Sequence, residues 1–203
     1  MARKTKEEAE RTRQLLLECA LRVFLEKGYS KTTLQDIASA ADLTRGAVYW
    51  HFRNKKDLYL ALMDTVFEPV HAFWENSRQS GAPADEVIAS LLEDWLVQLA
   101  SNARLVQALE LHFMKTEQGI ELGDCADQRR EENRTHLAVV EELFRRGQAE
   151  KRFREDVSPR TAAVNFWCVL LGYGLGRLDM ADIFDWKQSI PLLVDMYMRS
   201  IRA

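Results

Sequence analysis

The sequence has few of the residues that interrupt helices and no apolar run long enough to span a bilayer. Only four prolines and nine glycines occur in 203 residues, and the first proline is Pro69. Because proline breaks helices and turn-rich β folds use both residues often, this composition favours an all-α fold. The longest nearly apolar run, residues 166–176, is too short for a membrane span, so we expect no membrane contact. No apolar stretch follows the basic N-terminal residues, so we expect a cytoplasmic protein without a secretory signal.

Cysteines and enzyme motifs are also scarce. The three cysteines, Cys19, Cys125 and Cys168, lie far apart without metal-ligand spacing, which predicts reduced, mostly buried thiols and no bound metal or cofactor. The chain has no P-loop, no G-x-G-x-x-G fingerprint, no H-E-x-x-H and no nucleophile elbow. Glu110 and His112 are two positions apart, so a helix separates them by about 200° and they cannot converge. We therefore predict that the protein is not an enzyme.

Charge is distributed unevenly along the chain. The net charge is −3, but residues 1–60 carry 12 Lys or Arg and eight Asp or Glu, whereas the remainder carries 16 and 23. A basic module on an acidic body suits an anionic partner, such as nucleic acid, that meets only the first part of the chain.

Hydrophobic periodicity and capping residues predict three helices in the first 55 residues. Apolar residues at three- and four-residue steps indicate a helix over about 6–27. Thr33 with Asp36 is a capping box that opens a short helix, and Thr44 caps another over 45–51. Two short helices joined by a tight turn form the layout of a helix-turn-helix, whose second helix enters the major groove of DNA.

The two short helices have distinct inner and outer faces. The residues expected inside are Leu34, Ile37, Ala38, Ala41, Leu43, Ala47, Val48 and Phe52. Those expected outside on the second short helix are Thr44, Arg45, Gly46, Tyr49, Trp50 and His51. A solvated helix face normally carries Lys, Glu and Gln. Adjacent aromatic residues beside Gly and Arg instead suit contact with the sugar-phosphate backbone of DNA.

The rest of the chain is predicted to be helical throughout. Further helices are expected over 55–79, 84–101, 103–114, 124–151, 159–178 and 186–201. Pro191 leaves two alternatives, a last helix that is kinked there or one that begins as late as Ser189. We expect about nine helices in all, with a three-helix helix-turn-helix domain over 1–54 and a helical ligand-binding and dimerisation domain over 55–203.

A stretch of nearly 50 residues, from Leu17 to Leu62, carries a specific set of motifs. They are Thr32-Thr33, Asp36-Ile37-Ala38, Leu43 through Phe52 and Asn54 through Leu58. With this spacing the stretch resembles the TetR family of transcriptional repressors, and the opening residues and the run from Thr44 to Phe52 are similar to AcrR-type regulators of multidrug efflux pumps. The resemblance implies an all-helical homodimer that binds a palindromic operator in double-stranded DNA, represses an efflux operon and is released by a hydrophobic small-molecule inducer.

Eight residues of this stretch are predicted to bind DNA: Thr33, Thr44, Arg45, Gly46, Tyr49, Trp50, His51 and Lys55. Arg45 is the candidate for base recognition, because a guanidinium can bond bidentately to guanine. Thr33 and Thr44 lie at helix N-termini, which attract phosphate. Tyr49, Trp50, His51 and Lys55 match positions that usually contact phosphate and sugar in the TetR family, a role that the resemblance implies. The alternative for Trp50 is packing against a neighbouring helix, and for His51 a structural hydrogen bond.

The last two predicted helices are apolar on more than one face. Over 159–178, one apolar set is Ala163, Phe166, Trp167, Leu170, Leu171 and Gly174, and a second is Val164, Cys168, Gly172, Leu175 and Leu178. A helix that is apolar on two faces must be covered on both. We therefore expect the last two helices to form a four-helix interface across the twofold axis of a homodimer. The alternative is a buried core helix in a monomer.

The second domain is rich in aromatic residues, which line pockets for hydrophobic ligands. The candidate ligand-binding residues are Phe67, Trp74, Trp95, Glu110, His112, Phe113, His136, Phe166, Trp167 and Leu170. For each of them the alternative is core packing or a structural hydrogen bond, and the pocket itself is implied mainly by the resemblance. Two other functions stay open: a TetR-type regulator of another pathway, and a helical DNA-binding protein without a small-molecule ligand.

Overall fold

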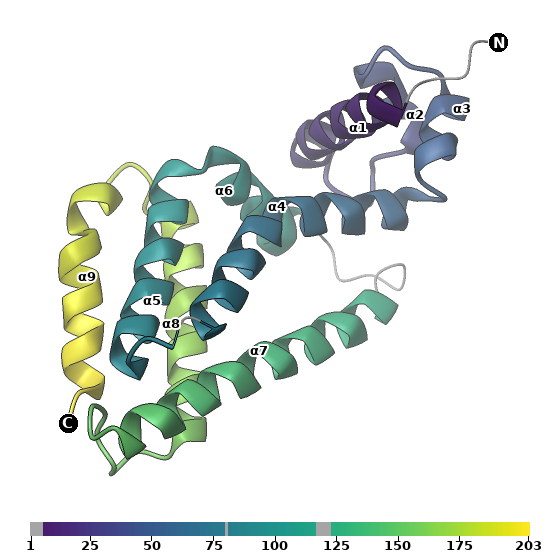
Figure 1. Cartoon of the computed structure of the whole chain (residues 1–203). Helices are drawn as coiled ribbons and strands as arrows, with labels where there is room; N and C mark the ends of the chain where they lie inside the picture. The colour runs from purple at the N-terminus through teal and green to yellow at the C-terminus, as the bar shows by residue number, and fades with distance from the viewer. Residues whose placement is uncertain (1–5, 80, 117–122) are drawn as a thin grey trace. The chain divides into compact units, whose positions relative to one another are not determined.

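The computed structural model describes residues 6–79, 81–116 and 123–203, and these residues form an all-α fold (Figure 1). The helices are α1 Lys6–Lys27, α2 Leu34–Ala40, α3 Arg45–His51, α4 Lys55–Gln79, α5 Ala84–Ser101, α6 Ala103–Glu110, α7 Gly123–Ala149, α8 Pro159–Asp179 and α9 Trp186–Ile201. The all-α prediction is confirmed. α9 begins at Trp186 and passes through Pro191, which decides between the two alternatives for the last helix. No helix in the described ranges is long and apolar enough to cross a membrane.

One predicted helix differs from the observed one. The pattern predicts a helix over 103–114, but α6 ends at Glu110 and a π-helical turn, η1, spans Leu111–Lys115. The Thr116 hydroxyl donates a hydrogen bond to the Leu111 carbonyl at 2.7 Å, five residues back. Hydrophobic periodicity cannot distinguish a π turn from an α turn over so few residues.

The chain divides into two compact units. The first, which we call the head, comprises Met1–Phe67 and Gln107–Gly123, and the second, the body, comprises Glu68–Val106 and Asp124–Ala203. The first unit thus extends well beyond residue 54, where the sequence places the domain boundary. Leu58 and Leu62 of α4 are fully buried and belong to the head, which explains the difference. The functional division into a DNA-binding and a ligand-binding domain stays a prediction.

Apolar side chains from α1, α2 and α3 form the core of the head. Six of the residues predicted to face inward are buried, namely Leu34, Ile37, Ala38, Ala41, Val48 and Phe52. Leu43 and Ala47 are half-buried. The turn between α2 and α3 is closed by a hydrogen bond from the Leu43 amide to the Ala38 carbonyl at 2.9 Å. The inner face predicted for the two short helices is therefore confirmed.

The body is built around α5, which lies beside α8 and α9 (Figure 1). One face of α5 is buried along its whole length by Val87, Ile88, Leu91, Leu92, Leu96 and Leu99. The indole nitrogen of Trp95 donates a hydrogen bond to the Leu170 carbonyl of α8 at 2.9 Å. Of the three cysteines, Cys19 is buried and Cys168 exposed, while Cys125 falls outside the side chains that the structure describes.

A capping network at the start of α2 makes the head sensitive to acid. Asp36 accepts hydrogen bonds from the Thr33 amide and hydroxyl at 2.8 and 2.6 Å and pairs with Lys27 at 2.6 Å. The hydrogen bonds from Lys27 and Thr33 hold the pKa of Asp36 well below its ordinary value of 3.8. A depressed pKa means that this carboxylate stabilises the folded state above about pH 4 and loses that contribution as the pH falls.

We therefore expect Asp36→Asn to lower the melting temperature at neutral pH and to reduce the further loss of stability below about pH 4. Circular dichroism melts over a pH series measure both effects. Asp195→Asn is the matched control, because Asp195 forms an exposed i,i+4 ion pair with Arg199 on α9. Identical pH profiles for Asp36→Asn and the unmodified protein would contradict the expectation.

Candidate functional site

The outer face of α3 is an exposed ridge, defined here as Thr44, Arg45, Gly46, Tyr49 and Trp50. All five residues are exposed, with 68% of Trp50 and 46% of Tyr49 accessible. The helix begins at Thr44, whose hydroxyl accepts a hydrogen bond from the Ala47 amide at 3.2 Å. Trp50 is thus not packed into the head, which removes the packing alternative for this residue. Two large aromatic side chains in water are unusual and point to a surface that is covered in use.

The guanidinium of Arg45 is held against Tyr49. Its Nη2 donates a hydrogen bond to the Tyr49 hydroxyl at 3.0 Å, and its central carbon lies 5.3 Å from the centre of the Tyr49 ring. Tyr49 lies one helical turn after Arg45, so both side chains lie on the same side of α3. This contact restricts the conformations of the long arginine side chain in the described structure.

Thr33 is engaged within the protein. Its hydroxyl accepts from the Asp36 amide at 3.1 Å and its own amide donates to the Asp36 carboxylate, which completes the predicted capping box. A phosphate at the N-terminus of α2 would therefore meet the Asp36 carboxylate as well as the helix dipole. The predicted phosphate contact at Thr33 stays a prediction.

Lys55 and His51 also have partners in the head. The Lys55 ammonium donates hydrogen bonds to the carbonyls of Tyr29 and Ser30 at 3.1 and 3.3 Å and lies 4.4 Å from the centre of the Tyr29 ring. The half-buried His51 ring contacts the Trp50 ring, with centroids 4.5 Å apart. Lys55 therefore has a structural role at the turn between α1 and α2, whatever it contributes to binding.

Four of the predicted ligand residues form an aromatic cluster in the body. The Trp74 ring lies 6.0 Å from His136, 6.3 Å from Phe166 and 6.1 Å from Trp167, and His136 stacks on Trp167 at 5.9 Å. These residues come from α4, α7 and α8, so the fold brings together positions that are distant in the sequence. Trp95 and Leu170 join α5 to α8 through the buried indole hydrogen bond described above.

The other four predicted ligand residues, Phe67, Glu110, His112 and Phe113, belong to the head. His112 shares a hydrogen bond between its Nδ1 and the Tyr59 hydroxyl at 3.2 Å. Phe113 is partly exposed beside His112, and Glu110 is half-buried. The predicted set is therefore divided between the two units.

Five residues of the body carry an enclosed side-chain nitrogen or oxygen that lacks a hydrogen-bond partner among the described residues: Trp74, Asp94, Arg104, Arg146 and Tyr197. Trp74 belongs to the predicted ligand set, whereas sequence reasoning missed Oδ2 of Asp94 and the hydroxyl of Tyr197. Burial raises the pKa of the Asp94 carboxyl and of the Tyr197 hydroxyl. An unsatisfied buried group costs about 1–3 kcal/mol, so such atoms call for an explanation, and an absent ligand is one. The available signal was the position of Asp94 within a largely apolar helix, directly before Trp95.

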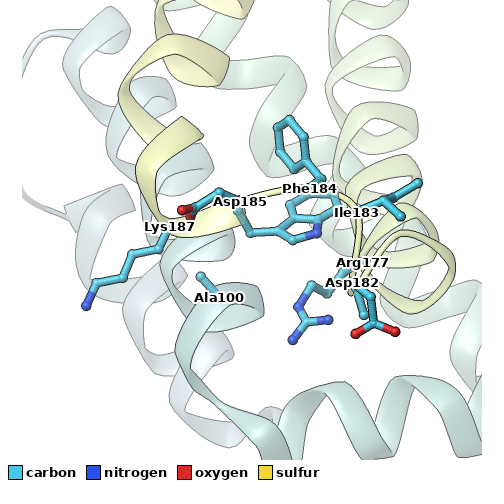
Figure 2. Close-up of a pocket in the computed structure, with 9 residues that line it drawn as sticks. Ala100, Arg177, Asp182, Ile183, Phe184, Asp185 and Lys187 are labelled. Atoms are coloured by element: carbon cyan, nitrogen blue, oxygen red, sulfur yellow. The ribbon is translucent and has the colours of Figure 1, made fainter.

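Sequence reasoning also missed a hollow at the junction of α8 and α9 (Figure 2). It has a volume of about 510 Å3 and is lined by Ala100, Arg177 and residues 181–187. Arg177 is anchored by a hydrogen bond from its Nε to the Leu99 carbonyl at 3.0 Å. A second hollow of about 700 Å3 lies along α7 between Glu131 and Arg146. None of the predicted ligand residues lines either hollow.

Comparison with known proteins gives the family of the chain. A model of bacterial regulatory proteins of the tetR family matches residues 16–62. The transcriptional regulator AcrR of Shigella flexneri is 31% identical over 208 residues, which cover 98% of this chain and 94% of AcrR.

Solved structures extend the similarity to the whole fold. NalD, the secondary repressor of the MexAB-OprM multidrug efflux pump in Pseudomonas aeruginosa, has a TM-score of 0.85 and 29% identity over 97% of this chain and 98% of NalD. A complex of SmeT with triclosan has a TM-score of 0.81 and 25% identity over 95% of this chain and 92% of SmeT. SmeT is the repressor of the multidrug efflux pump SmeDEF of Stenotrophomonas maltophilia. With a helix-turn-helix at its N-terminus and AcrR similar along nearly its full length, the chain belongs to the TetR family of bacterial regulatory proteins.

Proposed function

We propose that the protein is a dimeric repressor that binds a palindromic operator in the control region of a multidrug efflux operon and leaves it when a hydrophobic small molecule binds the body. The observation that carries the proposal is the α3 ridge, with Arg45, Tyr49 and Trp50 on the outer side of a helix whose inner side is buried. Similarity to AcrR and to NalD, an efflux-pump repressor, supports the choice of regulated genes.

The ridge suits the major groove of B-form DNA. Arg45 can donate two hydrogen bonds to O6 and N7 of guanine once its contact with Tyr49 opens or shifts, and Gly46 adds no side chain that would keep the helix backbone away from the bases. Tyr49 and Trp50 present flat apolar surfaces to the sugars and polar edges to the phosphates. A single module covers a few base pairs, so useful specificity requires two modules held about one turn of DNA apart.

Exposed apolar stripes on α8 and α9 support the dimer. On α8, Val164, Leu171 and Leu175 are exposed at helical spacing, and on α9 Leu192 and Met196 are each 61% accessible. Such stripes on neighbouring helices are typical of an interface with another chain. A second copy related by a twofold axis would cover both stripes with the same residues of its own.

The aromatic cluster around Trp74 is the proposed ligand site. Phe166 lies between Trp74 and Tyr197, at centroid distances of 6.3 and 5.5 Å, and both flanking side chains carry an enclosed polar atom without a partner among the described residues. Aromatic side chains packed together beside two polar atoms without partners suit a hydrophobic molecule that carries hydrogen-bonding groups. Triclosan, the ligand in the SmeT complex, is such a molecule. A ligand that favours the form unable to bind DNA shifts the dimer away from its operator.

The first prediction concerns base recognition. We expect Arg45→Ala to reduce the ratio of affinities for the operator and for scrambled DNA by about tenfold or more, because one bidentate contact contributes about 1–3 kcal/mol of discrimination per base. Fluorescence anisotropy with both duplexes measures the ratio. The control is Arg134→Ala, which removes an exposed arginine of α7 in the body. Equal losses of affinity for the operator and for scrambled DNA would show that Arg45 contacts phosphate and not the bases.

The second prediction concerns the dimer. We expect Leu192→Glu with Met196→Glu to give a species of 23.5 kDa in sedimentation at micromolar concentration, whereas the unmodified chain sediments at twice that mass. Charged residues in the interface would be buried without partners, which is costly. Val97→Glu is the control, since Val97 is an exposed apolar residue of α5. A monomeric unmodified chain would contradict the proposal.

The third prediction locates the ligand. Triclosan should quench tryptophan fluorescence and weaken operator binding, and Trp74→Phe with Trp167→Phe should remove most of both responses. Trp186→Phe is the comparison, because Trp186 lines the hollow at the junction of α8 and α9. If Trp186→Phe abolishes the response and the other pair does not, the ligand binds that hollow and our assignment is wrong.

A further inference from the structure

The π-helical turn η1 is part of the head although α4, α5 and α6 separate it from α1–α3 in the sequence. Leu111, its first residue, is fully buried. The carbonyl of Lys115, its last residue, accepts a hydrogen bond from the Tyr29 amide at 3.1 Å. Tyr29 lies in the turn between α1 and α2, so a downstream segment supplies a backbone partner to the turn that leads into the helix-turn-helix.

A side-chain contact joins the same two regions. The hydroxyl of the buried Tyr59, on α4, shares a hydrogen bond with His112 of η1. The Tyr59 ring then packs edge-on against Tyr29 at 5.2 Å and against Phe24 of α1 at 6.1 Å. His112, Tyr59 and Tyr29 therefore form one continuous row from η1 to the turn between α1 and α2.

The α1–α2 turn is held from a third side by Lys55. Its ammonium bonds the carbonyls of Tyr29 and Ser30, so both the amide and the carbonyl of Tyr29 are fixed by distant parts of the chain. Gly28, just before it, has a φ of +79°, a conformation that residues with a side chain rarely adopt. The helix that follows this turn is α2, which begins after its cap at Thr33 and packs against α3.

We propose that docked η1 positions the helix-turn-helix for DNA binding, and that His112 and Tyr59 are positioning residues that act through Tyr29 without touching DNA. The reasoning rests on the proposed DNA-binding function. η1 follows α6 without a break, and residues 103–106 of α6 belong to the body. η1 is therefore a segment of the head that is covalently continuous with the body. A π turn closes its hydrogen bond over five residues instead of the four of an α turn, and such turns are frequent at functional sites.

The test uses the full-length protein and a duplex selected from random sequence by the unmodified protein. Tyr59→Phe removes the hydroxyl that bonds His112 and keeps the ring contacts. We expect the dissociation constant to rise about two- to thirteenfold, the range for one lost hydrogen bond of about 0.5–1.5 kcal/mol. The matched control is Tyr173→Phe, which removes the hydroxyl of a half-buried tyrosine of α8 in the body and should leave DNA affinity unchanged.

Variants of His112 separate positioning from general stability. His112→Gln keeps a side-chain hydrogen-bonding group and should retain affinity, whereas His112→Leu should match Tyr59→Phe. The double variant Tyr59→Phe with His112→Leu should lose no more than either single variant, because both remove the same contact. Hydrogen exchange of the Tyr29 amide should accelerate in the variants that weaken binding.

Three results would overturn the inference. Unchanged DNA affinity for Tyr59→Phe and His112→Leu in a folded head would show a structural role alone. Additive losses in the double variant would show that the two residues act separately. Unchanged exchange of the Tyr29 amide would show that the contact does not hold the turn. If the unmodified protein selects no duplex at all, the proposed DNA-binding function itself fails, and the exchange measurement alone then decides whether the contact holds the turn.

Discussion

The exposed ridge of α3 depends on the burial of the helix's inner face. A helix of seven residues is not stable in water by itself, because nucleation is unfavourable and few hydrogen bonds follow it. Val48, with no accessible surface, and Phe52, at the end of α3, supply the packing that holds it. The opposite face is then available for Arg45, Tyr49 and Trp50. Their exposure contributes nothing evident to the stability of the free protein and is what the proposed DNA binding requires.

Polar contacts in the head are concentrated at helix ends and turns. Lys27, Asp36 and Thr33 close the start of α2, and Lys55 closes the turn before it. These contacts are partly exposed, so each adds modestly to stability, yet together they fix the direction in which the chain enters α2. Lys55 shows how a residue that suits a phosphate contact by sequence can be engaged by the protein's own carbonyls.

The body has the opposite character, since it leaves enclosed polar atoms that have no hydrogen-bond partner in the part of the chain that the structure describes. Trp74, Asp94 and Tyr197 each carry such an atom within a largely apolar bundle. A protein selected only for stability would replace these groups with apolar ones of similar shape at little cost. Their presence is consistent with a site adapted to a ligand, where the energy lost in the free protein returns when the ligand supplies the missing hydrogen bonds.

The sequence by itself determined all helices but the π turn after α6, the buried face of the helix-turn-helix and the exposure of the ridge, because these follow from local periodicity and from caps such as Thr33 and Thr44. It predicted Tyr49 and Trp50 on the outer face of α3, and it placed Trp74, His136 and Trp167 in one candidate set. Only the tertiary structure decided that His112 joins the head through Tyr59, that Lys55 bonds the carbonyls before α2, and that Asp94 is enclosed. The physical reason is that such contacts depend on which distant segments meet, and neither hydrophobic period nor capping pattern carries that information.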